Sequence, residues 1–232
     1  GSDEKALLAV LKRGRVTSGK IAKTFGHRLA SFMERKWAIP LQSGTDSIVL
    51  ALKILNLKKS AKIAIPAYSC GAILDEVAML SLRPVLVDIS RETLAMDIDS
   101  ANRTDCGAVI AAHLFGVAAP LFRINHENLI EDCAQCLGIS SEGVKAGSMG
   151  KLSLSSFYGT KIIAAGHGGV LAGNDERLFK TAMNILVHDK VEEGIPHLHF
   201  MMSDLNAALG LSQLRKIKFL LRRRRKIAAA YI

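Results

Sequence analysis

Short, almost wholly apolar runs alternate along this sequence with longer segments of helical periodicity. The runs predicted as strands are 62–65, 84–88, 108–113, 128–132, 152–157 and 168–173. The segments predicted as helices are 21–34, 45–57, 71–81, 175–187 and 204–230. A strand that is apolar on both faces needs cover on both faces, which is typical of a sheet between layers of helices. The alternation therefore predicts an α/β domain with a parallel or mostly parallel sheet.

Three of the predicted strands end in a side chain that can take part in chemistry. Asp88, His113 and Asp132 each close an apolar run. Ligands of open α/β sheets bind at the carboxyl ends of the strands. We therefore expect these three side chains on the functional edge of the sheet.

Composition excludes several classes of protein. Of the 232 residues, 49% are hydrophobic, which is enough for a substantial core in one or two domains. The apolar runs stay short of the roughly 18 residues expected of a membrane span, so we expect no membrane partner. Four cysteines in a chain of this length do not form a disulfide scaffold. A reducing, cytoplasmic compartment is the resulting expectation.

Five consecutive basic residues, Arg222 to Lys226, contribute to a formal net charge of +10. Such a run can bind nucleic acid, but no aromatic stacking platform or nucleic-acid motif accompanies it, and a solvated helix face is favoured. A positive field also attracts phosphorylated small molecules. The run belongs to residues 204–232, which we read as one long helix that follows a large domain of residues 1–203. The helical pattern is still running where the chain stops.

A turn followed by a helix at 41–55 can hold an anion. Ser43, Gly44 and Thr45 leave backbone N–H groups free at the helix start, and the helix dipole favours negative charge there. The alternative is an ordinary capped helix, since no P-loop lysine follows. Asp46 puts a negative charge near this turn, which favours contact through its backbone only.

Residues 152–173 place a lysine in a loop between two apolar runs. Serines and a threonine precede Lys161, and Gly166, Gly168 and Gly169 follow it. A lysine between buried strands is costly unless it is paired or used covalently. Burial and nearby cations lower the pKa of a lysine and make its neutral amine a nucleophile or base. The alternative is a surface lysine on a loop.

Other patterns are weaker. The His197-Leu-His199 pair lacks a third ligand at a metal-site spacing, and we expect no metal. Cys133 and Cys136 have a Cys-x-x-Cys spacing, but neither a thioredoxin-like context nor further zinc ligands accompany it. We interpret both cysteines as small packing side chains.

The anion cradle, the strand-end acid and the loop lysine fit one cofactor. Pyridoxal 5'-phosphate needs a phosphate anchor, an acid that faces its pyridine nitrogen and a lysine that forms a Schiff base. The sequence at this point resembles the DegT/DnrJ/EryC1/StrS aminotransferases, which are pyridoxal-phosphate enzymes of fold type I. The resemblance follows the chain in order through "QSGTDSIVLALKIL", "VIAAHLFG", "LIEDCAQCLG", "GSMGKLSLSSFYGTKIIAAGHGGVLAGNDERL" and "MSDLNAALGLSQL".

The resemblance implies an aspartate-aminotransferase-like large domain, with the family's smaller C-terminal domain expected where this chain ends. It implies that Lys161 forms the Schiff base and moves a proton, and that Asp132 pairs with the pyridine nitrogen. Gln135 contacts the ring near its phenolic oxygen, Ser156 holds the phosphate, and His113 lies nearby. The residues that the resemblance places at the cofactor are Gly44, Thr45, Asp46, Cys70, Asp132, Gln135, Ser156, Lys161 and His199.

Four positions depart from the family's pattern. Cys70 stands where an aromatic residue usually stacks on the ring, and Tyr68 is two positions earlier. His167 replaces the glutamate of Gly-Glu-Gly-Gly. His199 replaces an asparagine that reaches the phosphate of the partner chain, and Met201 replaces a nearby arginine.

The function implied by the resemblance is transfer of an amino group from an amino acid, usually glutamate, to a nucleotide-linked keto sugar, for the biosynthesis of polysaccharides or sugar derivatives. A homodimer with shared active sites is implied as well. Two alternatives remain. A dehydratase-like relative would carry histidine in place of Lys161, and a non-catalytic or regulatory protein could use the same scaffold.

Overall fold

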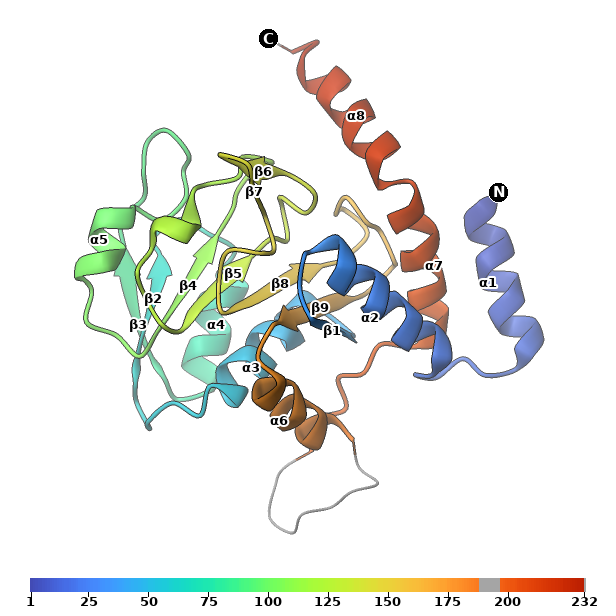
Figure 1. Cartoon of the computed structure of the whole chain (residues 1–232), viewed down its shortest axis with the longest axis horizontal. Coiled ribbons are helices and arrows are strands. Elements are labelled where there is room, and N and C mark those ends of the chain that lie inside the picture. The colour runs from blue at the N-terminus through green and yellow to red at the C-terminus, as the bar shows by residue number, and fades with distance from the viewer. Residues whose placement is uncertain (188–196, 232) are drawn as a thin grey trace.

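The computed structural model describes residues 1–187 and 197–231, and its centre is a seven-stranded sheet covered by helices on both faces (Figure 1). The order of the strands is β1-β9-β8-β5-β4-β2-β3. The strands are β1 (Trp37–Leu41), β2 (Lys62–Pro66), β3 (Arg83–Val87), β4 (Ala108–Ala112), β5 (Leu129–Asp132), β8 (Leu152–Ser156) and β9 (Gly169–Gly173). A separate hairpin joins β6 (Ser140–Ser141) and β7 (Val144–Lys145).

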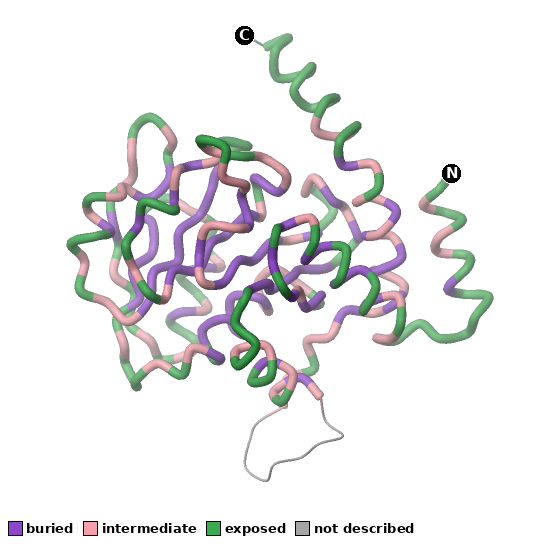
Figure 2. Tube along the Cα trace, viewed as in Figure 1, coloured by how far each residue is buried: buried purple, intermediate pink, exposed green. Residues whose placement is uncertain are grey.

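Helices cover the sheet in two layers. They are α1 (Ser2–Arg13), α2 (Lys20–Phe32), α3 (Gly44–Ile54), α4 (Gly71–Met79), α5 (Ile98–Arg103), α6 (Glu176–Leu186), α7 (Asp204–Arg215) and α8 (Ile217–Ala228). Apolar side chains of α3, α4 and α6 pack on one face of the sheet. Those of α2, α5 and α7 pack on the other. Burial is densest in the strands, whereas α1 and α8 are largely exposed (Figure 2).

The six strands predicted from the apolar runs are confirmed, and so is the mostly parallel sheet. Strands β3, β2, β4, β5 and β8 are parallel, while β9 is antiparallel to both β8 and β1. The sequence did not predict β1. Its Pro40 cannot donate a ladder hydrogen bond, but β1 lies at an edge of the sheet, where proline is tolerated. Helices α1 and α5 and the hairpin β6–β7 were not predicted either.

The single long helix expected over 204–230 is divided into α7 and α8 at Lys216. The N–H of Lys216 donates to the carbonyl of Gln213, three residues back, which closes a tighter turn. Here Lys216 turns toward α1, and its Nζ lies 2.6 and 2.7 Å from the carboxylate oxygens of Asp3. Helix α7 packs closely on α2, because Gly210 leaves room for the ring of Phe25. The domain division at 203/204 stays a prediction.

A membrane span is not among the described elements. No helix within residues 1–187 and 197–231 is both long enough and apolar enough to cross a bilayer.

Candidate active site

A cavity of about 420 Å³ opens where the parallel strands end. The carboxyl end of β5 brings Asp132, the segment after β4 brings His113, and the end of β8 brings Ser156. The start of α3 and the loop between β8 and β9 complete its wall. Residues of the sequence prediction that line this cavity are Gly44, Thr45, Cys70, His113, Asp132, Gln135, Ser156 and Lys161. The structure therefore brings most of the predicted cofactor residues together.

The start of α3 lies directly against the end of β8. The hydroxyl of Ser43 caps the helix by accepting the N–H of Asp46 at 2.9 Å. A Cβ on Gly44 would lie 2.9 Å from the Cβ of Ser156, so only glycine lets the turn approach this strand. A side chain on Gly169 would overlap the carbonyl of Ser43. The two glycines hold the cradle against the sheet and leave a helix N-terminus facing the cavity, a favourable place for an anion.

Asp46 itself does not line this cavity. Its backbone N–H is used by the Ser43 cap, and it lines a neighbouring cavity with Gln42 and Met202. Burial acts to raise the pKa of its carboxyl, and the bonds with Ser43 oppose this. A contact between Asp46 and a phosphate stays a prediction, and Gly44 and Thr45 are better placed for it.

Asp132 is almost enclosed, with 8% of its surface exposed. Its Oδ1 accepts the N–H of Ala134 at 2.8 Å, and no other hydrogen bond to its side chain occurs among the described residues. Burial raises the pKa of this carboxyl, against the effects of the Ala134 bond and of the charge on Lys161. A buried carboxylate with so few donors is poised to gain a cationic or N–H partner.

Lys161 is half-buried in the loop between β8 and β9. Its own N–H donates to the carbonyl of Tyr158 at 2.9 Å, which forms a turn. Within the described part of the chain, its ammonium makes no hydrogen bond or ion pair. It lines the same cavity as Asp132 and acts electrostatically on that carboxyl. The lysine and the acid thus face one space from two separate elements.

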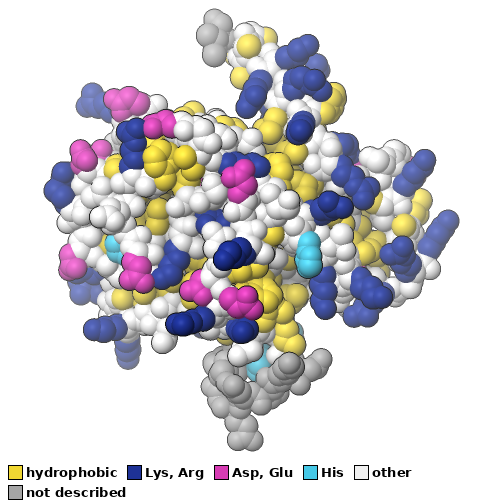
Figure 3. All heavy atoms as spheres, in the orientation of Figure 1, with side chains coloured by type: hydrophobic (Ala, Val, Ile, Leu, Met, Phe, Trp, Pro, Cys, Tyr) yellow, Lys and Arg dark blue, Asp and Glu magenta, His cyan; other side chains and the backbone are white. Residues whose placement is uncertain are grey.

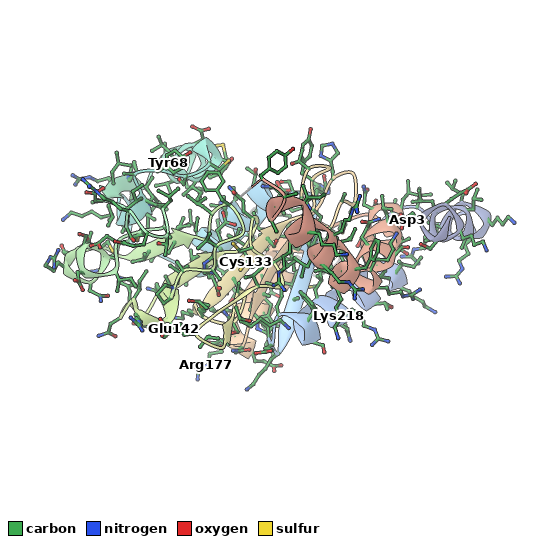
Figure 4. The ribbon with its side chains drawn as sticks, turned by 90° about the horizontal axis from the view of Figure 1, so that it is seen from above. Asp3, Tyr68, Cys133, Glu142, Arg177 and Lys218 are labelled. Atoms are coloured by element: carbon green, nitrogen blue, oxygen red, sulfur yellow. The ribbon has the colours of Figure 1, made fainter. Side chains whose placement is uncertain are left out.

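Gln135 lies on the rim of the cavity. Its Oε1 accepts the N–H of Phe115 at 3.0 Å, so the amide nitrogen remains to face a ligand. Cys70 is exposed and lines the cavity at the start of α4. Tyr68 is not among the residues that line the cavity, and the centroid of its ring lies 6.2 Å from that of Phe115. Figure 4 shows Tyr68 at one side of the molecule, away from the interior position of Cys133.

Two predicted residues are not brought to the cavity. Asp88 follows the edge strand β3, is exposed, and accepts the N–H of Ile89. Its place on the functional edge is therefore corrected: β3 is the outermost strand, remote from the lysine loop. His199 is exposed and lies outside the lining, and its carbonyl accepts a bond from Gln42. Its contribution to a partner's site stays a prediction.

Sequence reasoning missed a buried ionic network behind Asp132. Glu131 points to the opposite face of β5, where its oxygens accept the backbone N–H groups of Gly147, Met149 and Gly150 at 2.7 to 3.2 Å. Nη2 of Arg35 lies 3.6 Å from Glu131 Oε2, with both side chains buried. Burial acts to raise the pKa of Glu131, but the bonds from His113 and the backbone outweigh it and the pKa is lowered. The signal was an acid inside a strand, which has to be paired.

His113 links this network to the cavity. Its Nδ1 accepts the N–H of Ala119 at 3.0 Å, so the ring proton lies on Nε2, which donates to Glu131 Oε1 at 3.0 Å. Both nitrogens are therefore used. Although His113, Glu131 and Cys133 lie close together, the imidazole offers no lone pair to a metal ion.

The two cysteines of the Cys-x-x-Cys spacing are core residues, as the sequence interpretation expects. Both belong to the apolar cluster beneath α2. Burial raises the pKa of Cys133 well above its ordinary value and that of Cys136 to about 12. Neither thiol is a thiolate near neutral pH, so this pair lacks the reactivity of a redox couple.

The donor set of the cavity fits pyridoxal phosphate. A helix start with a neighbouring serine suits the phosphate, a buried acid suits the pyridine nitrogen, and a lysine without a partner among the described residues suits the Schiff base. The phosphate, the protonated pyridine nitrogen and the aldehyde of the cofactor are thus each matched by a different element of the fold.

Comparisons with known proteins relate the chain to one family. The model of the DegT/DnrJ/EryC1/StrS aminotransferase family matches residues 1–232. A GDP-perosamine synthase from Vibrio cholerae is 28% identical over 247 residues, which cover 100% of this chain and 67% of the relative. One from Escherichia coli O157:H7 is 27% identical, over 93% of this chain and 63% of the relative. The chain thus spans about two thirds of the length of these relatives.

Solved structures share the fold. A sugar aminotransferase from Streptococcus pneumoniae in its PLP form superposes with a TM-score of 0.88 at 22% identity, over 99% of this chain and 68% of that one. The GDP-4-keto-6-deoxymannose-3-dehydratase ColD, a mutant with bound GDP-perosamine, gives 0.89 at 23% identity, over 98% and 69%. An aminotransferase of the same family from Brucella abortus gives 0.88 at 25% identity, over 99% and 67%. The expected pyridoxal-phosphate fold of type I is confirmed.

Proposed function

Because the chain belongs to the DegT/DnrJ/EryC1/StrS aminotransferase family, whose cofactor is pyridoxal 5'-phosphate, we propose that it forms the cofactor-binding part of a sugar aminotransferase. The proposed reaction moves an amino group from an amino acid, with glutamate as the first candidate, to a nucleotide-linked keto sugar. The proposed setting is the cytoplasmic biosynthesis of polysaccharides or sugar derivatives. The relatives named GDP-perosamine synthase support this substrate class.

One observation carries the proposal: Lys161, Asp132 and the start of α3 line the same cavity. When bound, the cofactor supplies an electron sink for the substrate carbon. Lys161 Nζ would hold it covalently and then move a proton at the reacting carbon. The Asp132 carboxylate would hold the proton of the ring nitrogen. The backbone N–H groups of Gly44 and Thr45 and the hydroxyl of Ser156 would bind the phosphate.

Amino transfer is favoured over the dehydratase alternative by one residue. The dehydratase-like relatives are expected to carry histidine at the position of Lys161, which cannot form a Schiff base. The lysine is present and lines the cavity. The non-catalytic alternative draws its support from Cys70 and His167, which also line the cavity and depart from the family's pattern.

Borohydride reduction tests the covalent site. The protein loaded with pyridoxal phosphate is reduced and digested, and mass spectrometry locates the modified peptide. We expect the label on Lys161 and none in Lys161→Ala. Lys145, on the strand β7, is the matched control, because its substitution by alanine should leave the label in place. A label elsewhere in the wild-type protein, or one that persists in Lys161→Ala, contradicts the assignment.

The amino donor and the alternative function are separated by a half-reaction. Glutamate is added to the loaded protein, and conversion of the cofactor to its amino form is followed by absorbance. Conversion supports an aminotransferase, and subsequent reversal by a nucleotide-linked keto sugar supports the proposed acceptor. If the protein carries the Lys161 label but no amino acid converts its cofactor to the amino form, the non-catalytic alternative is supported.

A homodimer is part of the proposal. Three aromatic side chains are widely exposed in the single chain, namely Tyr68 at 50%, Phe115 at 62% and Tyr158 at 52%, and Tyr158 lines the cavity. Exposed aromatic groups are enriched at protein interfaces. Sedimentation analysis should give a mass of two chains, and Tyr68→Ser with Phe115→Ser should shift it toward one. A monomeric wild-type protein would refute this part of the proposal.

A further inference from the structure

The turn that follows β4, residues 113–119, begins at a histidine whose side chain closes it. We propose that His113 is a positioning residue for the cofactor: it holds this turn, and the turn holds the amide of Gln135 with its nitrogen free for the phenolic oxygen of pyridoxal phosphate. The inference rests on the proposed function and on the expected contact of Gln135 with the cofactor ring. From the sequence, His113 had a place near the cofactor but no role.

The turn needs support from outside. The N–H of Val117 donates to the carbonyl of Leu114 at 2.8 Å, and between them Phe115 and Gly116 have φ angles of 53° and 78°. Positive φ at both central residues is typical of a type I′ turn, and only the glycine adopts it at little cost. Phe115 therefore keeps this conformation while other contacts hold the turn. One of these contacts is a weak S–H bond from Cys136 to the carbonyl of Val117 at 3.2 Å.

His113 supplies a stronger, buried contact. Its Nδ1 accepts the N–H of Ala119 at 3.0 Å, and its Nε2 donates to Glu131 Oε1 at 3.0 Å. The side chain has no exposed surface, so the histidines visible in Figure 3 are other residues. Glu131 is itself fixed by three backbone N–H groups. The imidazole thus connects the far end of the turn to the buried network of β5.

The N–H of Phe115 decides which way round the amide of Gln135 lies. A backbone N–H can only donate, so it selects the oxygen of the amide, Oε1, at 3.0 Å. The amide nitrogen, Nε2, makes no hydrogen bond among the described residues, and Gln135 lines the cavity together with Asp132 and Lys161. An N–H group suits a phenolic oxygen, which accepts. The reversed amide would place two acceptors against each other.

Two substitutions separate the two bonds of the imidazole. In His113→Asn, the side-chain oxygen takes the place of Nδ1 and can accept the N–H of Ala119, but the bond to Glu131 is lost. In His113→Gln, the amide nitrogen takes the place of Nε2 and can donate to Glu131, but nothing replaces Nδ1. We therefore expect His113→Gln to release the turn and His113→Asn to keep it. A role confined to the Glu131 network predicts the reverse order.

His126→Gln is the matched control. The Nδ1 of His126 accepts the N–H of Asn128 at 3.0 Å, and its Nε2 donates to the carbonyl of Cys106 at 3.1 Å. The same pair of bonds thus occurs near the other end of β5, and His126 is not among the described residues that line the cavity. Its substitution should lower stability without affecting Gln135.

Hydrogen exchange of the whole chain before addition of cofactor, resolved by residue with NMR, tests the turn. We expect the N–H of Phe115 to exchange about tenfold or more faster in His113→Gln than in the wild type, because the buried N–H of Ala119 loses its acceptor and the turn opens. In His113→Asn and His126→Gln the rate should stay within about threefold of the wild type. Equal exchange in the wild type and His113→Gln, or faster exchange in His113→Asn than in His113→Gln, overturns the proposal.

Binding of pyridoxamine 5'-phosphate, measured by calorimetry, tests the link to the cofactor. This probe has the ring, phosphate and phenolic oxygen of the cofactor but no aldehyde to react with Lys161. We expect Gln135→Ala to weaken its affinity by about tenfold, the loss of one hydrogen bond to a charged group, and His113→Gln to weaken it by a similar factor. In a Gln135→Ala background, His113→Gln should add less than about twofold, because both act through one contact. A full additional loss in that background, or an unchanged affinity in His113→Gln, overturns the proposal.

A surface substitution replaces His113→Gln if that variant does not fold. Gly116→Ala strains the same turn at φ 78°, and its Cβ would meet only the Cδ1 of Ile139, at an ordinary 3.8 Å. It should also weaken the binding of pyridoxamine 5'-phosphate, and only while Gln135 is present. An unchanged affinity, or a loss that persists in the Gln135→Ala background, then overturns the proposal.

Borohydride labelling of Lys161 with pyridoxal phosphate, measured on the same samples, separates this inference from the proposed function. If the wild type is labelled but His113→Gln binds the probe as tightly as the wild type, the proposed function stands and this inference fails. If the probe binds with the expected pattern of variants but no label forms, this inference stands and the proposed aminotransferase fails. No binding of the probe to the wild type overturns this inference, and the label then decides the proposed function.

Discussion

Glu131 and Asp132 are adjacent carboxylates at the end of one strand, and they lie in opposite environments. Glu131 faces a closed interior, where three backbone N–H groups, His113 and Arg35 surround it. Asp132 faces the cavity with one backbone donor. The alternation of side chains along a strand creates this difference within a single peptide unit. One acid completes the fold, and the other is left incomplete for a ligand.

The pKa shifts of the two acids express the same contrast. Burial acts to raise the pKa of both, but donors reverse the direction for Glu131, whose pKa is lowered. For Asp132 burial prevails and the pKa is raised. Charge on Glu131 therefore stabilises the folded chain, whereas charge on Asp132 costs stability until a partner arrives. The candidate site is thus the place in this fold where a buried acid, Asp132, is left with few partners.

The largest effect should follow from removal of the cavity acid. Asp132→Ala removes the only carboxylate among the described residues that line the cavity and should lower turnover by about 10³-fold, the cost of deleting one partner of a buried charged hydrogen bond. Steady-state rates with glutamate and a nucleotide-linked keto sugar measure this. Asp88→Ala is the control, since Asp88 also ends a strand but lies outside the cavity. Retained turnover in Asp132→Ala would remove Asp132 from the mechanism.

The interior acid should instead affect folding. Glu131→Gln leaves Arg35 buried without its anionic partner and should lower the free energy of unfolding by about 3–5 kcal/mol. Urea denaturation at neutral pH measures the loss. Since the folded pKa of Glu131 is lowered, its contribution is complete above the ordinary carboxyl pKa of about 4.3 and disappears as the pH falls through the lower folded value.

An exposed ion pair provides the control for this variant. Arg123 Nη2 lies 2.6 Å from Glu142 Oε2, but both side chains are about half exposed. Glu142→Gln should therefore cost no more than about 1 kcal/mol. Equal losses from Glu131→Gln and Glu142→Gln would show that the interior network does not stabilise the fold.

Sequence patterns predicted the role of Asp132, which faces the cavity, but not the network around Glu131, which faces the interior. Apolar runs fixed the strands, and strand ends pointed to Asp132, because a parallel sheet puts its functional groups there. Lys161 stood out as a charge between two buried runs. Glu131 also stands inside an apolar run, but its partners cannot be read from the sequence: Arg35 and Gly147 are distant along the chain and meet it only through tertiary packing.

The helix end of the chain shows a second limit of sequence reasoning. The periodicity of 204–230 predicts one helix, yet the contact between Lys216 and Asp3 accompanies a break between α7 and α8. A pairing across more than two hundred residues cannot be read from local spacing. The same break sets α8 apart from α7.

Substitution of Asp132 by asparagine should have a smaller effect, on the free energy of unfolding. Asp132→Asn keeps an oxygen that can accept the Ala134 N–H and removes a charge whose burial raises the carboxyl pKa. The folded wild-type chain without cofactor binds its proton more tightly than the unfolded chain, so its stability falls as pH rises from about 4 through the raised pKa. The variant should therefore be the more stable protein near about pH 8 and equal to the wild type near about pH 4. Urea midpoints of both proteins across this range measure it, and a constant difference would refute it.

The smallest effect should come from the two cysteines that follow this pair of acids in the sequence. Cys133 returns to the Glu131 side of the strand, and Cys136 donates to the carbonyl of Val117 at 3.2 Å. Cys133→Ala with Cys136→Ala should leave borohydride labelling of Lys161 unchanged and lower stability by about 1 kcal/mol per removed sulfur. Thiol titration of the native wild-type protein should find Cys70 reactive and both buried thiols silent, since burial keeps them protonated. Rapid reaction of Cys133 or Cys136, or loss of the label in the double variant, would contradict this prediction and would show that the thiols belong to the cavity.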